Sequence, residues 1–302
     1  MMNVDEIEAF VAIAELGGFT RAGRRLHRTQ PAISRRLGIL EQELGAPMFE
    51  RIRGNARLTE AGRAVLPHAE AALAALQDGR EAVRGLRAGL HGTVSLALVG
   101  TLADTHIVDA LRKFAQHAKD VRVELRTASS SEVTDLVRRG EAMLGLRYFK
   151  ADRTELASLD VGSEAMLVVA VAGHRMANRR VRNARALADE RWIGFAPTRG
   201  DRDSSGHVLA RQLVRAGLHD ADITVIDSLT AQKRLAQAGF GLALVPESSV
   251  REELRLGLLV SLDVPAMRTS IPVTAIHRRN AYLTPAAKSL LALLVDGAPM
   301  AT

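Results

Sequence analysis

Glutamine, serine and arginine side chains near the N-terminus have a spacing that suits the recognition of DNA bases. Gln30 and Ser34 are four residues apart and therefore share one helix face, away from the apolar Ile33. Glutamine can pair with adenine through two hydrogen bonds, arginine can pair with guanine, and serine suits a base or a phosphate. We predict that this helix enters the major groove, with Pro31 and Arg35 beside Gln30 and Ser34.

The charge around these residues also indicates a polyanionic partner. Residues 16–40 contain six arginines and no acid, within a chain of net charge +7. A net charge of this size is about as common in proteins that bind no nucleic acid as in those that do. The clustering of arginines in this one segment therefore carries the argument. We add Thr20 and Arg36 to the predicted DNA contacts. Arg51 and Arg53, beside a Gly54-Asn55 turn, are predicted to form a basic wing for phosphates or the minor groove.

A second group of polar side chains lies at the ends of expected strands in the C-terminal part. Open α/β sheets bind ligands beyond the carboxyl ends of their strands, and hydroxyl and guanidinium groups together suit an anion. We therefore predict a small carboxylate as the ligand. The alternatives are helix capping for the hydroxyl residues and a surface ion pair for the arginine. The predicted contacts are Thr101, Ser129, Ser130, Arg147, Thr198 and Arg199.

The N-terminal elements are those of a winged helix-turn-helix. Apolar periodicity predicts a helix over 4–15, a short helix capped by Thr20, and a third capped by Thr29. Two short strands, 48–51 and 57–59, then form a hairpin. Thr59 is predicted to cap a long helix that runs to about residue 87, where Gly79 is expected to allow a bend.

Apolar residues recur every seven positions along that long helix, at Ala69, Leu76, Val83 and Leu90. This is the pattern of a coiled-coil seam, and it predicts that two copies of the chain pair there. Packing within one chain is the alternative reading of the same stripe.

The remainder alternates strands and helices. Strands are expected near 94–99, 121–127, 143–148, 192–195, 222–226 and 241–245, with helices near 103–117, 130–139, 206–217 and 229–238. Such alternation predicts parallel sheets, and two rounds of it predict two lobes. We assign the fold class α/β, with a two-lobed, periplasmic-binding-protein-like effector domain after the winged helix-turn-helix. The expected domains are 1–59 for DNA binding, 60–90 for the linker and dimerisation helix, and 91–302 for the effector.

Several classes of site have no signal in the sequence. The chain contains no cysteine, which excludes disulfides, thiolate metal sites and thiol-based redox sensing. Its histidines lack metal-ligand spacing, and no phosphate-binding loop or catalytic motif is found. We expect no cofactor, no metal site and no catalytic residues. No apolar run is long enough to span a membrane, and we expect a cytoplasmic protein.

Residues 19–34, FTRAGRRLHRTQPAIS, resemble the helix-turn-helix signature of LysR-type transcription regulators. The resemblance continues in LEQELG at 40–45, MFER at 48–51 and LTEAG at 58–62, and more loosely in AGFGLALVP at 238–246. It implies a regulator controlled by a small molecule and acting on double-stranded DNA as a homodimer or homotetramer. Gly23 departs from the signature, which usually has a second alanine there, and is expected to weaken its helix.

A transport-type solute-binding protein or an enzyme is the alternative, because two α/β lobes around a cleft also describe those proteins. Either would be favoured by a secretion signal or a catalytic constellation, and the sequence shows neither. Residues 1–65 would also have no role in such a protein.

Overall fold

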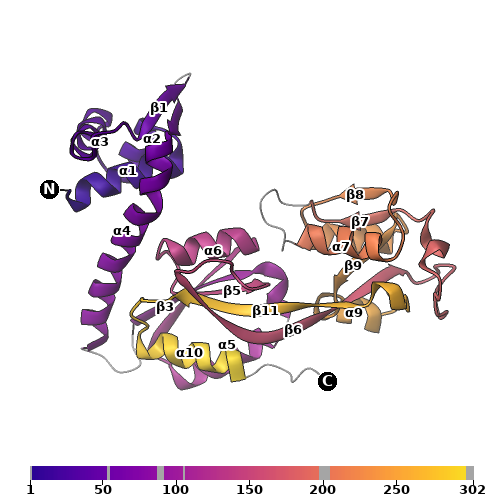
Figure 1. Cartoon of the computed structure of the whole chain (residues 1–302). Helices are drawn as coiled ribbons and strands as arrows, with labels where there is room; N and C mark the ends of the chain where they lie inside the picture. Colours follow the sequence, from indigo (N-terminus) through magenta and orange to yellow (C-terminus); the bar gives the residue numbers. More distant parts are fainter. Residues whose placement is uncertain (1, 53–54, 87–91, 105, 197–204, 297–302) are drawn as a thin grey trace. The chain divides into compact units, whose positions relative to one another are not determined.

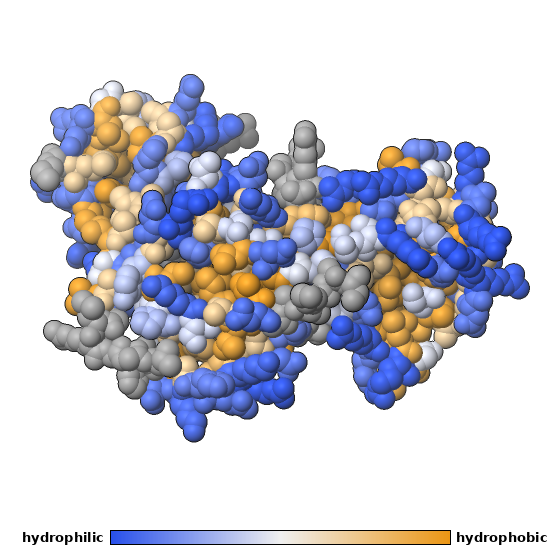
Figure 2. All heavy atoms as spheres, turned by 60° about the horizontal axis from the view of Figure 1, so that its bottom comes forward, coloured by the Kyte–Doolittle hydropathy of each residue, from blue (hydrophilic) through white to orange (hydrophobic). Residues whose placement is uncertain are grey.

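The computed structural model describes residues 2–52, 55–86, 92–104, 106–196 and 205–296 (Figure 1). The chain forms two compact units. The first contains residues 1–87 with 138–141 and 280–282, and the second contains the rest. In both, polar side chains cover much of the surface, and hydrophobic ones are visible between them (Figure 2).

Three helices pack together at the start of the first unit: α1 (Val4–Leu16), α2 (Phe19–Arg25) and α3 (Gln30–Leu44). Asn3 and Glu6 cap α1 reciprocally, and Gly17 ends it in the left-handed conformation with φ of 65°. The apolar faces of α1 and α3 meet in a core that includes the fully buried Phe10 and Ile33. The predicted helices therefore owe their stability to one shared core.

A hairpin and a long helix complete this unit. Strands β1 (Phe49–Ile52) and β2 (Asn55–Leu58) pair antiparallel. Helix α4 (Glu60–Leu86) follows, and Thr59 caps it by accepting the Gly62 N–H at 3.0 Å. A Cβ at Gly62 would lie 2.2 Å from the carbonyl oxygen of Met48, so only glycine lets α4 start this close to the hairpin.

Helix α4 is continuous over 27 residues, although it contains Pro67 as well as Gly79. The proline was not singled out in the sequence, and a proline in a helix interior ordinarily costs about 3 kcal/mol. Part of the predicted seam packs on the α1–α3 core through Ala69. Leu76 and Val83 further along remain 45% and 58% exposed.

The second unit is built on a nine-stranded sheet whose order is β4-β3-β5-β11-β6-β9-β7-β8, with β10 paired to β6. The strands are β3 (Gly92–Val99), β4 (Val121–Ala128), β5 (Leu144–Tyr148), β6 (Leu156–Val171), β7 (Trp192–Gly194), β8 (Ile223–Val225), β9 (Leu242–Pro246), β10 (Leu259–Leu262) and β11 (Thr269–Arg278). The expected strands β3, β4, β5, β7, β8 and β9 are present, and their pairings with one another are parallel.

The expected parallel pairing holds for these six strands, but the sheet is mixed, because β6 and β11 are long antiparallel strands in its middle. Strand β11 pairs with β5 on one side and with β6 on the other. Strand β6 continues past that pairing to β9 and β10. The two lobes therefore share one sheet and are joined through these two strands.

Helices cover both faces of the sheet (Figure 1). They are α5 (Ile107–His117), α6 (Ser130–Arg138), α7 (Ser205–Arg215), α8 (Leu229–Gln237), the short α9 (Arg251–Arg255) and α10 (Pro285–Asp296). On β3, Leu96 belongs to the core with α5 and α10, whereas its neighbour Ala97 packs with Val133 of α6. Successive strand residues point to opposite faces, so one strand contributes to both cores.

Candidate nucleic-acid interface and ligand pocket

The turn between α2 and α3 is tight. The Arg28 N–H donates to the Gly23 carbonyl oxygen at 2.8 Å, and His27 has a positive φ of 53°. A Cβ at Gly23 would lie 2.7 Å from the carbonyl oxygen of Arg28. The glycine that we expected only to weaken α2 therefore permits the close approach of the turn that orients α3.

The N-terminal part of α3 presents the predicted base-reading side chains. Gln30, Pro31 and Arg35 are exposed, Ser34 is half-buried, and Ile33 on the other side is fully buried. The predicted cap is only partly right: Thr29 occupies the N-cap position, but its side chain makes no capping hydrogen bond.

Two other predicted DNA contacts, Arg36 and Thr20, do not lie beside Gln30 and Ser34 on α3. Arg36 follows Ser34 by two residues, or roughly 200° around the helix, and forms an ion pair with Asp5 of α1. It therefore lies on the side of α3 that faces α1. Thr20 is exposed, but it stands inside the first turn of α2, where Gly18 is the N-cap. The prediction that Thr20 caps this helix is wrong.

The predicted wing corresponds to the β1–β2 hairpin. Arg51 lies in β1 opposite Ala56, whose N–H donates to the Gly17 carbonyl oxygen at 3.2 Å. This bond ties the hairpin to the end of α1. Arg53 lies outside the described residues.

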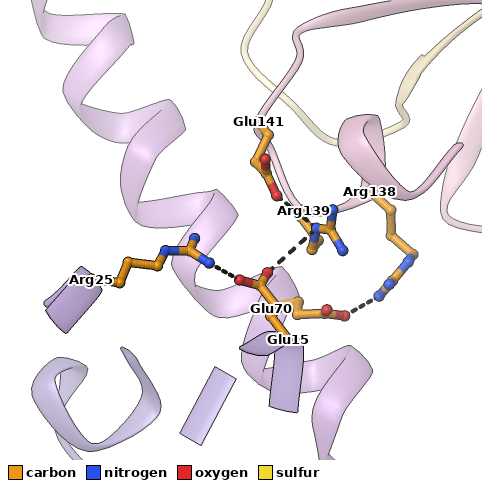
Figure 3. A network of polar contacts seen from close by, with 6 residues as sticks. All are labelled: Glu15, Arg25, Glu70, Arg138, Arg139 and Glu141. Carbon is orange, nitrogen blue, oxygen red and sulfur yellow. Dashed lines mark hydrogen bonds and ion pairs between the residues drawn. The ribbon is translucent and has the colours of Figure 1, made fainter. Parts of the chain in front are cut away.

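An acid-base network lies within the first unit (Figure 3). Glu15 pairs with Arg25 and, at 3.5 Å, with Arg139, which also contacts Glu141 at 2.7 Å. Glu70 pairs with Arg138. Arg25 therefore has an ion-pair partner on α1, although it belongs to the arginine-rich stretch of the sequence.

A small pocket, with a cavity volume of about 20 Å³, lies within the second unit, where the carboxyl ends of parallel strands from both lobes meet. Thr101 follows β3, and Tyr148 ends β5. Gly194 ends β7, and Pro246 ends β9. This is the position at which open α/β sheets bind ligands, and it agrees with the expected location of the cleft.

The pocket has one polar end and apolar walls. The hydroxyl oxygens of Thr101 and Tyr148 are 2.7 Å apart and hydrogen-bonded. The remaining lining comes from the long strands β6 and β11 and from the second lobe, through Met166, Ile271, Phe195, Val208, Leu209 and Leu244. The described lining residues include no charged side chain.

Two other predicted ligand contacts, Ser129 and Ser130, are not among the described residues that line this pocket. Ser129 caps α6: its N–H and hydroxyl each donate to Glu132 Oε2 at 2.8 Å. The Ser130 carbonyl oxygen accepts from Thr134 Oγ1 at 2.9 Å. Capping was the alternative reading of these serines, and it describes Ser129. Thr198 and Arg199 lie outside the described residues.

Arg147 is buried on the side of the sheet that faces α6. Its guanidinium donates to Thr134 Oγ1 at 2.9 Å and to the Tyr148 carbonyl oxygen at 3.1 Å. Since neighbouring strand residues point to opposite faces, Tyr148 is the side chain of this pair that reaches the pocket. The expectation that Arg147 borders the ligand is therefore corrected.

A half-buried carboxylate, Glu164, lies on β6 close to the pocket lining. It is opposite Ile271 in the β6–β11 register and two residues from Met166. Burial raises the pKa of Glu164, whereas the hydrogen bond from Ser248 Oγ at 2.6 Å and the positive charges of Arg251 and His106 oppose that rise. The environment as a whole disfavours the charged form.

Comparison with known proteins identifies both units. Residues 4–63 match the family described as "Bacterial regulatory helix-turn-helix protein, lysR family", and residues 87–299 match the "LysR substrate binding domain". The chain belongs to the LysR family of transcription regulators. The helix-turn-helix match also decides against the solute-binding alternative, and the matched proteins are regulators, not enzymes.

Relatives of this LysR-type chain match over nearly its whole length. The HTH-type transcriptional regulator IlvR of Caulobacter vibrioides is 32% identical over 98% of both chains. Among solved structures, a full-length OxyR variant from Pseudomonas aeruginosa has a TM-score of 0.71 at 20% identity, covering 98% of this chain and 94% of that one. CbnR, described as a LysR family transcriptional regulator, has 0.66 at 23%, covering 99% and 100%. These two structures support the fold.

Within the described ranges, no helix is long and apolar enough to cross a membrane. The same part of the chain has no cluster of three or more His, Cys, Asp or Glu suited to a metal ion.

Proposed function

We propose that this LysR-family regulator binds specific double-stranded DNA through the exposed N-terminal side chains of α3. Gln30 and Arg35 supply the donors and acceptors for base edges, and Ser34 supplies a base or phosphate contact. The observation that carries the proposal is the exposure of Gln30 and Arg35, with the half-buried Ser34 beside them, on a helix held by the α2–α3 turn. The β1–β2 hairpin, with Arg51 and Arg53, contacts the DNA backbone or the minor groove. Thr20, exposed in the first turn of α2, contributes a backbone contact. Arg36 contributes only after separating from Asp5.

The active form is proposed to be a homodimer paired through α4, which can associate further into a homotetramer. One helix-turn-helix covers few base pairs, and a two-fold dimer gains specificity by binding two half-sites. The exposed Leu76 and Val83, one heptad apart, support pairing along this helix.

The effector is proposed to be a small organic anion in the pocket between the lobes. The hydroxyls of Thr101 and Tyr148 are able to donate to a carboxylate. Ser129 and Ser130 belong to the same proposal only as secondary contacts, because neither is among the described residues that line the pocket. Thr198 and Arg199, which follow the lining residue Phe195 in the sequence, are also proposed as contacts of the anion. Binding there would shift the population of lobe arrangements without chemical change to the ligand.

A selection experiment tests the DNA-binding proposal and requires no information on the target genes. The full-length protein is incubated with random-sequence duplexes, and bound DNA is amplified and sequenced over several rounds. We expect enrichment of a site with two related half-sites in inverted orientation. Recovery of unenriched DNA, or binding that salt abolishes equally for all sequences, would contradict specific recognition.

A further inference from the structure

A phenylalanine beside the ligand pocket has an unusual backbone conformation. Phe149 follows Tyr148 at the end of β5 and has a positive φ of 59°. A residue with a bulky side chain rarely adopts this left-handed conformation, because its Cβ crowds the backbone. The peptide group before Phe149 is held on both sides. The Tyr148 carbonyl oxygen accepts from Arg147 Nε at 3.1 Å, and the Phe149 N–H donates to the Pro272 carbonyl oxygen at 2.8 Å. These two hydrogen bonds keep the strained conformation in place.

The ring of Phe149 contacts the other lobe. The guanidinium carbon of Arg211 on α7 lies 5.6 Å from the ring centroid, within the range of a cation–π interaction. Helix α7 belongs to the second lobe, because its Leu209 packs against Gly194 of β7, whereas Phe149 follows β5 of the first lobe. Tyr148 and Leu209 both line the pocket. The contact between Phe149 and Arg211 therefore joins the two lobes directly beside the pocket.

This contact is suited to form and break. Phe149 is half-buried and its backbone is fixed by the two hydrogen bonds, so the ring is presented to α7 at little further cost in order. Arg211 is exposed, and a cation–π interaction of an exposed arginine is weak. The strands β6 and β11 run through both lobes and keep them linked when the contact is lost. A weak contact between linked lobes matches a device that shifts between two arrangements of similar free energy.

We infer that Phe149 and Arg211 form a latch that holds the two lobes in the arrangement described above, and that the lobes rotate about β6 and β11 when the latch opens. This inference rests on the proposed function, which requires that an effector shift the population of lobe arrangements. It adds the contact that sets this population in the protein without effector. The latch does not depend on the chemistry of the effector.

The test measures the distance between the lobes in the full-length protein without an effector. The chain has no cysteine, so Lys119→Cys and His219→Cys supply a single pair of attachment sites for spin labels. Both residues are exposed, one before β4 in the first lobe and one before β8 in the second. Labelled chains are co-assembled with an excess of unlabelled chain, so that double electron–electron resonance reports distances within one chain. We expect one main distance in the parent protein.

Two substitutions remove the latch from its two sides. In Arg211→Ala and in Phe149→Leu, the population at distances other than the parent's main distance should rise at least about threefold, as expected for the loss of one weak contact. The double variant should add little to either single variant, because both changes remove the same interaction. Such a ratio of populations can be measured even where a substitution lowers overall stability.

Two further variants serve as controls. Phe149→Trp keeps an aromatic ring, and tryptophan is the strongest partner in cation–π interactions, so this variant should keep the parent's main distance. Arg215→Ala removes the same kind of side chain one turn further along α7, where the arginine is also exposed, and should leave the distribution unchanged.

Several results would overturn the latch. They are equal distributions for Arg211→Ala and the parent, an effect of Arg215→Ala as large as that of Arg211→Ala, and additive effects of Arg211→Ala and Phe149→Leu. Any of them would leave the proposed function intact, because neither an effector nor DNA enters the measurement. Failure of the DNA selection would in turn leave the latch intact.

Discussion

Two carboxylates in the effector unit have opposite effects on stability. Burial raises the pKa of Glu164, so the folded state disfavours its charge. The N–H and hydroxyl of Ser129 lower the pKa of Glu132, so the folded state favours that charge. The charge of Glu132 has a structural role, because this carboxylate caps the start of α6. Glu164 reduces stability at neutral pH and lies close to the ligand pocket, which suggests a role in function.

Glu164→Gln should therefore stabilise the protein, most strongly at neutral pH. A raised pKa in the folded state means that the charged form carries a penalty above the ordinary pKa of 4.5, and this penalty disappears as the pH falls through the raised pKa. Melting temperatures of the variant and the parent, measured from about pH 4.5 to 8, should diverge as the pH rises.

Glu132→Gln is the matched control with the opposite sign. Because its pKa is lowered, charged Glu132 contributes stability above pH 4.5, and that contribution is lost as the pH falls through the lowered pKa. The variant should thus melt below the parent at neutral pH. If both substitutions shifted the melting temperature in the same direction, the assigned environments would be wrong.

Individual residues were predictable where their role depended on local chemistry. Gln30 and Thr101 were identified from helix spacing and strand ends, and both are placed as expected. The prediction for Arg147 was wrong because Arg147 and Tyr148 are neighbours on one strand and point to opposite faces of the sheet. The sequence does not show which of these faces is covered by α6, and it is the face on which Arg147 lies. Apolar pocket residues such as Leu209 cannot be distinguished from core residues by type or spacing.

At the scale of elements, α4 is the main candidate for assembly. Replacing Leu76 and Val83 with glutamate would put like charges at the centre of the pairing surface. We expect the double variant to have at most half the parent's molar mass by light scattering, and weaker DNA binding because the two half-sites are no longer linked.

The matched control adds the same charges to a different side of α4. Ala64 and Ala71 are exposed and lie roughly 120° and 140° around the helix from Leu76, so Ala64→Glu with Ala71→Glu should leave the mass unchanged. Equal masses for the parent and the Leu76/Val83 double variant would place the dimer contact elsewhere.

Elements with strong periodicity were predicted closely, and irregular ones were not. The expected helix over 4–15 is α1 (Val4–Leu16), and the expected strand over 121–127 is β4 (Val121–Ala128). Strand β6 has the apolar pattern of a buried strand only in its second half. Its first half contains Asp160 and Gly162, and a register shift in the β11 pairing interrupts the alternation there.

At the scale of the whole molecule, local pattern cannot reveal pairings between distant segments. The two βα rounds were expected to form two lobes with parallel sheets. Strand β11, near the C-terminus, instead pairs with both β5 and β6, for example Thr274 with Arg147 and with Asp160. This pairing joins the lobes into one sheet and brings the strand ends of both to a single pocket.

Recognition of the DNA sequence by α3 is the central claim, and one comparison of binding affinities tests it directly. Gln30→Ala and the parent are titrated by fluorescence anisotropy against the selected site and against a random duplex of equal length. The exposed Gln42, about three turns further along α3, is the matched control as Gln42→Ala. We expect Gln30→Ala to lose about 1–3 kcal/mol of binding free energy on the selected site and little on random DNA. Equal losses on both duplexes, or a loss for Gln42→Ala as large as for Gln30→Ala, would contradict base recognition by this helix.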